Sequence, residues 1–172
     1  VTVAGSARFS QNFQETAQSD ATNMYPAFLV LIIVLSYLLL RSVLASLLSL
    51  IIIFLSILPS MGSAGWLEYQ VLPPLIIAPI VILTIALAHA IHILSIALSN
   101  MNEGMQKDVA IIESMKINFM PVFLTSFTTG VGVAGVNFGN IPAFSEMANA
   151  VVFGSLYSFL LSITVLPVLF MI

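Results

Sequence analysis

The sequence predicts an all-α integral membrane protein with five membrane-spanning helices and one interfacial helix. Of its 172 residues, 60% are hydrophobic and only 6% are charged. A soluble domain carries about a quarter charged residues and has too little interior to bury so much apolar surface. The apolar residues also gather in runs long enough to cross a bilayer, so lipid must cover much of the surface.

Residues 1–23 differ from the rest because they are polar and amphipathic. They predict a short extended start at residues 2–5, then a juxtamembrane helix that packs on its own domain. The apolar residues of that helix recur at helical spacing, at Ala7, Phe9, Phe13 and Ala17. Asp20 or Thr22 is a suitable cap for the next helix, and Pro26 suits its first turn.

Five apolar stretches define the predicted spans, at residues 25–40, 43–61, 72–98, 119–138 and 147–172. Only two residues separate the first two spans, which indicates adjacent antiparallel helices. We expect Pro73, Pro74 and Pro79 to kink or reshape the start of the third span. Residues 102–116 carry charges and one apolar face, which predicts an interfacial helix.

The basic residues predict the orientation in the membrane. Arg41, Lys107 and Lys116 fall on one side when the spans are counted alternately, and the two opposite loops carry no Lys or Arg. The positive-inside rule then places residues 41–42 and 99–118 in the cytoplasm. We expect a multi-pass protein of the inner (plasma) membrane whose N-terminal segment lies outside, in the periplasm of a Gram-negative bacterium.

The composition argues against several classes of function. Four Lys and Arg residues leave no basic patch for nucleic acid, and the absence of cysteine excludes disulfides and thiolate metal sites. We found no nucleophile with a base and acid partner, and no glycine loop with a lysine for phosphate. We therefore expect no enzyme activity, no cofactor and no nucleic-acid partner.

Two histidines, His89 and His92, interrupt the third predicted span. On a helix they share an arc of about 140° with Thr84, Ser95 and Ser99. Ionisable side chains are costly at membrane depth and by default mark a transport or proton path. Imidazole titrates near neutral pH, so these residues are candidates for a proton relay that faces neighbouring helices or a hydrated crevice.

Two other interpretations of the histidines remain open. Each imidazole can simply hydrogen-bond a neighbour and hold the helices together. Zinc binding is a weaker alternative, because two histidines with no acid on the same face supply only two ligands.

The fourth predicted span carries a hydroxyl-rich face. Thr125, Thr128, Thr129 and Gly132 fall within about 100° of arc on a helix. Small and hydroxyl-bearing residues favour close helix packing in membranes. The alternative is that the threonines extend a hydroxyl relay beside the histidines.

The order and spacing of several short motifs resemble a known family. The pieces are Phe13…Asp20…Pro26, Leu40-Arg41-Ser42, Leu72-Pro73-Pro74-Leu75, Ala88-His89-Ala90-Ile91-His92-Ile93-Leu94, Pro121…Thr125-Ser126-Phe127-Thr128-Thr129 and Pro142…Phe144. Together they resemble one half of the transmembrane region of the resistance–nodulation–division (RND) superfamily, in its MMPL-type exporter branch. Each piece alone is weak, but the set covers nearly all of the chain.

The resemblance implies that this chain is a fragment of a longer protein. Residues 1–23 would be the end of a large periplasmic domain. The five spans would be helices two to six of a six-helix RND-type repeat, related to the sterol-sensing domain. The resemblance also implies a missing second half of the same chain and proton-driven export of lipids or other hydrophobic compounds.

The chain departs from the family pattern at one position. Relatives usually carry an aspartate three residues before the histidine that His92 matches, and here His89 stands at that place. Either His89 takes over the proton, or coupling has been lost or has moved to the other half.

Three functions are compatible with these observations. The first is a proton-coupled exporter with His89 and His92 as the relay. The second is a non-transporting lipid- or sterol-sensing module, and the third is a protein-export accessory of the same superfamily. The expected partners are the lipid bilayer, a hydrophobic or lipid substrate, the missing half and a second copy of the chain.

Overall fold

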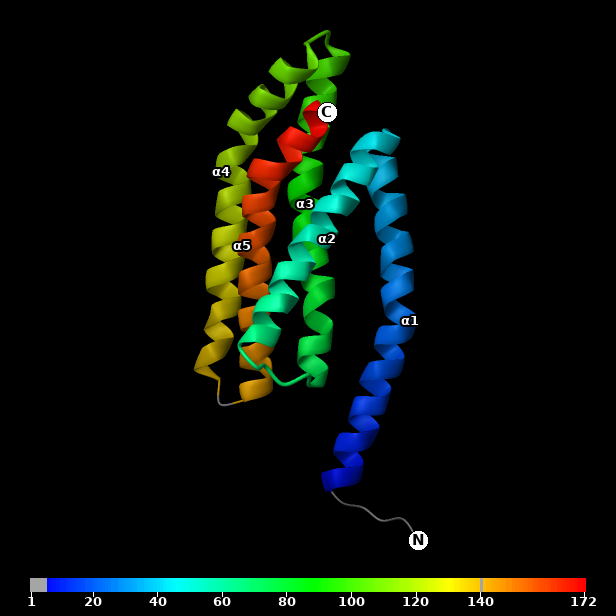
Figure 1. Ribbon diagram of the computed structural model, residues 1–172, viewed down its shortest axis with the longest axis vertical. Coiled ribbons are helices and arrows are strands. Elements are labelled where there is room, and N and C mark those ends of the chain that lie inside the picture. Colours follow the sequence, from blue (N-terminus) through cyan, green and yellow to red (C-terminus); the bar gives the residue numbers. More distant parts are fainter. Residues whose placement is uncertain (1–5, 140) are drawn as a thin grey trace.

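A computed structural model describes residues 6–139 and 141–172 as a bundle of long helices (Figure 1). Its elements are α1 (Ser6–Leu40), α2 (Val43–Trp66), α3 (Pro73–Asn102), α4 (Lys107–Ala134), the 3₁₀ helix η1 (Gly135–Phe138) and α5 (Pro142–Met171). In this part of the chain, five helical segments are long and apolar enough to cross a membrane. The predicted all-α membrane fold is confirmed.

Helix α5 is the centre of the bundle and packs against α2, α3 and α4. Among the described residues, helix α1 contacts only α2 and α3, and Figure 1 shows it at the edge of the bundle, with its N-terminal end extending past the other helices. Much of the surface of α1 is therefore left to lipid, while α2, α3 and α5 supply most of the interior.

The turn between α1 and α2 is as tight as the two intervening residues require. Arg41 adopts a left-handed conformation with φ 49°, and its N–H donates to the carbonyl of Tyr37 at 2.8 Å, which ends α1. Ser42 then caps α2, because its hydroxyl oxygen accepts from the Ala45 N–H at 3.4 Å.

The start of the chain differs from the prediction. Helix α1 runs without interruption from Ser6 to Leu40 and contains Pro26, so the expected separate juxtamembrane helix and the cap at Asp20 or Thr22 are wrong. Proline removes only one backbone hydrogen bond, and membrane helices tolerate that loss. The extended start expected at residues 2–5 lies outside the described residues.

The boundaries of the other helices also differ from the predicted ones. Helix α4 passes through Pro121 as one continuous helix, so the separate interfacial helix expected at residues 102–116 is wrong. Helix α2 continues five residues beyond the predicted end at residue 61, and α5 begins at Pro142, before the predicted start at residue 147. The helices are longer than the apolar runs in the sequence. Backbone groups must be hydrogen-bonded within the membrane, so a helix does not end before it has crossed the hydrocarbon core.

The three prolines near the start of α3 lie within one continuous helix. Pro73 and Pro74 occupy its first turn, where the missing N–H groups need no partner, and Pro79 lies inside the helix. At the other end, Gly104 has φ 96°, and its neighbour Met105 donates to the carbonyl of Asn100 at 3.1 Å. This left-handed residue ends α3 and begins the turn to α4.

Small residues let the helices approach closely. Most of the buried polar side chains are serines, and several cross between helices, such as Ser36 to Ser49 at 2.7 Å and Ser60 to the Ala150 carbonyl at 2.6 Å. Where α3 and α5 pack, Gly154 of α5 lies against the side chain of Ile82 of α3. This packing of small and hydroxyl-bearing residues is typical of helix contacts in membranes.

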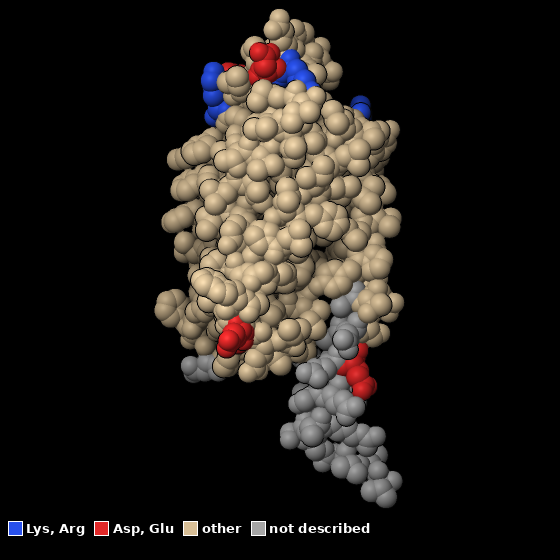
Figure 2. All heavy atoms as spheres, in the orientation of Figure 1, with Lys and Arg blue, Asp and Glu red and all other residues tan. Residues whose placement is uncertain are grey.

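Three of the four basic residues, Arg41, Lys107 and Lys116, lie at one end of the bundle. Arg41 follows α1, and Lys107 and Lys116 belong to the first turns of α4. On the face shown in Figure 2, Lys and Arg gather at the upper end above a wide uncharged band. Such an uncharged band is expected for a protein surrounded by lipid.

Candidate functional site

His89 is the most buried ionisable side chain described, with 1% of its surface exposed. It lies near the middle of α3 and points between α4 and α5. Its Nδ1 atom is 2.9 Å from the Ser158 hydroxyl of α5, and its Nε2 atom is 3.2 Å from the Ser126 hydroxyl of α4. Both ring nitrogens thus have a hydroxyl partner, and each partner comes from a different helix.

Hydroxyl partners suit an imidazole that changes its protonation state. A neutral imidazole has one donor and one acceptor nitrogen, whereas the imidazolium ion has two donors. A serine hydroxyl can donate or accept after a rotation, so Ser126 and Ser158 can satisfy His89 in either state. The site can therefore hold or release a proton without leaving a buried nitrogen unpaired.

Helix α5 presents a row of serines to this site. Ser155, Ser158 and Ser162 are spaced three and four residues apart and are all buried. The Ser155 hydroxyl donates to the Ser126 carbonyl at 3.1 Å, which joins α5 to α4 beside His89. In contrast, the buried hydroxyl of Ser162 has no hydrogen-bond partner among the described residues.

This difference between two neighbouring serines predicts different effects of mutation. Ser158→Ala is expected to lower the free energy of unfolding by about 1–2 kcal/mol, because a buried imidazole nitrogen loses its partner. Ser162→Ala removes an unpaired buried hydroxyl and is expected to leave stability unchanged or higher. Unfolding of the two variants in detergent checks this, and equal losses would contradict the assigned hydrogen bond.

The other residues of α3 that we expected on the relay face are not gathered around His89. His92 and Thr84 are exposed and Ser95 is half-buried. The Thr84 hydroxyl donates to the carbonyl of Val81 at 2.7 Å, and the Ser95 hydroxyl donates to the carbonyl of His92 at 3.3 Å. These hydroxyls are thus satisfied by their own helix.

The threonines of α4 behave in the same way. Thr125 donates to the Pro121 carbonyl and Thr128 to the Leu124 carbonyl, each at 2.8 Å. Thr125 and Thr128 are exposed, and Thr129 is half-buried. We refer to these exposed and half-buried polar residues of α3 and α4 collectively as the open polar face, defined by Thr84, His92, Ser95, Thr125, Thr128 and Thr129.

The two partners of His89 were missed by sequence reasoning. Ser126 stands next to the residue that was chosen, Thr125, and Ser158 lies in a span from which no residue was chosen. A signal for the second was present, because Ser155, Ser158 and Ser162 repeat at helical spacing inside an apolar run. In the described part of the chain, no group of three or more His, Cys, Asp or Glu side chains could hold a metal ion.

Comparison with known proteins agrees with this architecture. No curated protein matches the chain. A model of the MMPL family matches residues 1–172, which is the entire sequence. The chain therefore belongs to the MMPL family, and with it to the RND/MMPL type of membrane transporters.

Proposed function

We propose that this protein takes part in proton-driven export of lipids or other hydrophobic compounds, with His89 as the proton-carrying residue. The observation that carries the proposal is the burial of His89 between Ser126 and Ser158. A titratable group in a membrane interior is costly, and its usual role is in an ion or proton path. Because either hydroxyl can donate or accept, both ring nitrogens can stay hydrogen-bonded when a proton is bound or released.

The open polar face supports a second part of the proposal. Its His92 is exposed at a depth where ionisable side chains do not face lipid. We propose that further helices cover this face and make His92 part of the path, as the resemblance to a two-halved transporter implies. The end of the bundle with Arg41, Lys107 and Lys116 would then face the cytoplasm.

A sensing module without transport is the second candidate. The observation that favours it is His89 itself, which stands where relatives usually carry an aspartate. In this interpretation His89 only joins α3 to α4 and α5, and the protein binds a lipid or sterol for a partner.

Flux measurements in sealed vesicles separate the two candidates. We expect the full-length protein to export a hydrophobic fluorescent substrate when a proton gradient is imposed, and to stop when an ionophore removes the gradient. The gradient direction that drives export also reports the orientation of the protein. Binding of the substrate without any gradient-dependent flux would contradict export and favour the sensor.

A further inference from the structure

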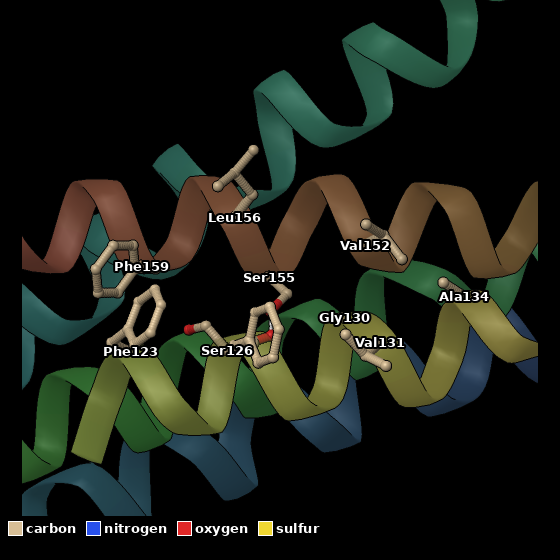
Figure 3. Close-up of a pocket in the computed structure, with 10 residues that line it drawn as sticks. Phe123, Ser126, Gly130, Val131, Ala134, Val152, Ser155, Leu156 and Phe159 are labelled. Atoms are coloured by element: carbon tan, nitrogen blue, oxygen red, sulfur yellow. Dashed lines mark hydrogen bonds between the residues drawn. The ribbon is translucent and has the colours of Figure 1, made fainter. Parts of the chain in front are cut away.

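A groove of about 390 Å³ runs along the outer surface between α4 and α5 (Figure 3). Phe123 and Phe159 meet edge to face at one end, with ring centroids 5.7 Å apart. Val131 and Leu156 line the sides and are 59% and 50% exposed, so the groove is open along its length. Gly130 leaves room on the α4 side, because a Cβ atom there would meet nothing within 4 Å.

The accessible lining of the groove is apolar. Its two serines, Ser126 and Ser155, direct their hydroxyls to protein atoms, namely the His89 ring and the Ser126 carbonyl. No charged side chain lines it. A ligand with a polar or charged head would lose its hydration here without replacement, whereas an alkyl chain would not.

The length of the groove matches that of one acyl chain of a bilayer. The groove extends along α4 from Phe123 to Ala134, which is about 16 Å at the helical rise. The hydrocarbon core is about 30 Å thick, so the chains of one leaflet extend about 15 Å. The alternative occupant is a helix of another protein. A helix of this length is about 10 Å wide and would fill about 1,200 Å³, which exceeds the groove volume of about 390 Å³.

We propose that the α4–α5 groove binds the acyl chain of a bilayer phospholipid. The chain lies lengthwise over Gly130 and ends against the rings of Phe123 and Phe159. It covers the outer side of Ser126 and keeps that side of the His89 hydrogen bond free of water. The proposal does not depend on export, because binding needs neither a gradient nor a substrate.

Photolabelling tests the site directly. The full-length protein is reconstituted in phosphatidylcholine vesicles that contain a trace of phosphatidylcholine with a diazirine in one acyl chain. After illumination, the adducts are located by mass spectrometry. We expect several-fold more adducts at Val131 and Leu156 than at Leu38, an exposed residue of the peripheral helix α1 whose 62% exposure is similar.

Two matched glycine variants sharpen the test. Gly130→Leu fills the groove and is expected to abolish the adducts at Leu156 while those at Leu38 remain. Gly132→Leu makes the same change two residues away, at a glycine that also has open space around it but does not line the groove. It is expected to keep both sets of adducts.

Three results would overturn the proposal. One is equal labelling of the groove and Leu38 in the unmodified protein, which would mean ordinary contact with fluid lipid. Another is an unlabelled groove beside a labelled Leu38, which would mean that protein covers it. The third is a Gly130→Leu variant that labels Leu156 as strongly as before. The first two comparisons need no variant, so they hold even if Gly130→Leu fails to fold.

Discussion

Replacing His89 by glutamine is expected to abolish gradient-driven export while the protein still inserts and folds. Glutamine can hydrogen-bond Ser126 or Ser158 but cannot carry a proton at any physiological pH. Flux in sealed vesicles is therefore expected to fall to the level seen without a gradient. The amount of protein in the membrane and its unfolding temperature serve as measures of folding.

Two companion variants identify the residue that carries the proton. His89→Asp introduces a titratable carboxylate at the position where relatives usually have one, and is expected to retain gradient-dependent flux with an altered pH profile. His92→Gln tests the exposed histidine of the open polar face. Unchanged flux in His89→Gln would refute the role of His89, and a loss confined to His92→Gln would move the relay to that residue.

Replacing Gly154 by alanine is expected to destabilise the helix bundle by overpacking. A Cβ atom at this position would overlap the Ile82 side chain, with Cδ1 and Cγ2 at 2.7 and 2.9 Å and Cγ1 closer still. Ile82 is fully buried and branched at Cβ, so it has little freedom to turn away. Such overpacking costs about 1–3 kcal/mol. Unfolding in detergent measures the loss.

The same helices supply a control and a rescue. Gly130→Ala adds the same methyl group where space is open, and is expected to leave stability nearly unchanged. Ile82→Ala alone leaves a cavity, which costs about 2–5 kcal/mol. Combined with Gly154→Ala it removes the clash, so the double variant should be more stable than the sum of the single losses predicts. Strict additivity would argue against the Gly154–Ile82 contact.

Hydropathy and spacing were sufficient to predict the membrane fold, the number of spans and the place of His89 within one of them. These properties depend only on residues that are close in the sequence. A run of about 20 apolar residues must be helical in lipid, because its backbone N–H and C=O groups need hydrogen-bond partners there. The same reasoning failed at the helix ends. It treated Pro26 as the start of a span and separated residues 102–116 from α4, although α1 and α4 continue through Pro26 and Pro121.

The surroundings of His89 could not be read from local pattern. Its partners Ser126 and Ser158 are 37 and 69 residues away in the chain. Helical periodicity predicts which residues lie on the same face of α3, but it does not predict which helix that face contacts. Periodicity grouped His89 with His92 and Thr84, yet packing turned His89 into the bundle and left the other two exposed. The membrane location of the imidazole thus follows from composition and helix length, whereas its hydrogen bonds follow from the way α3, α4 and α5 pack, because that packing brings distant residues into contact.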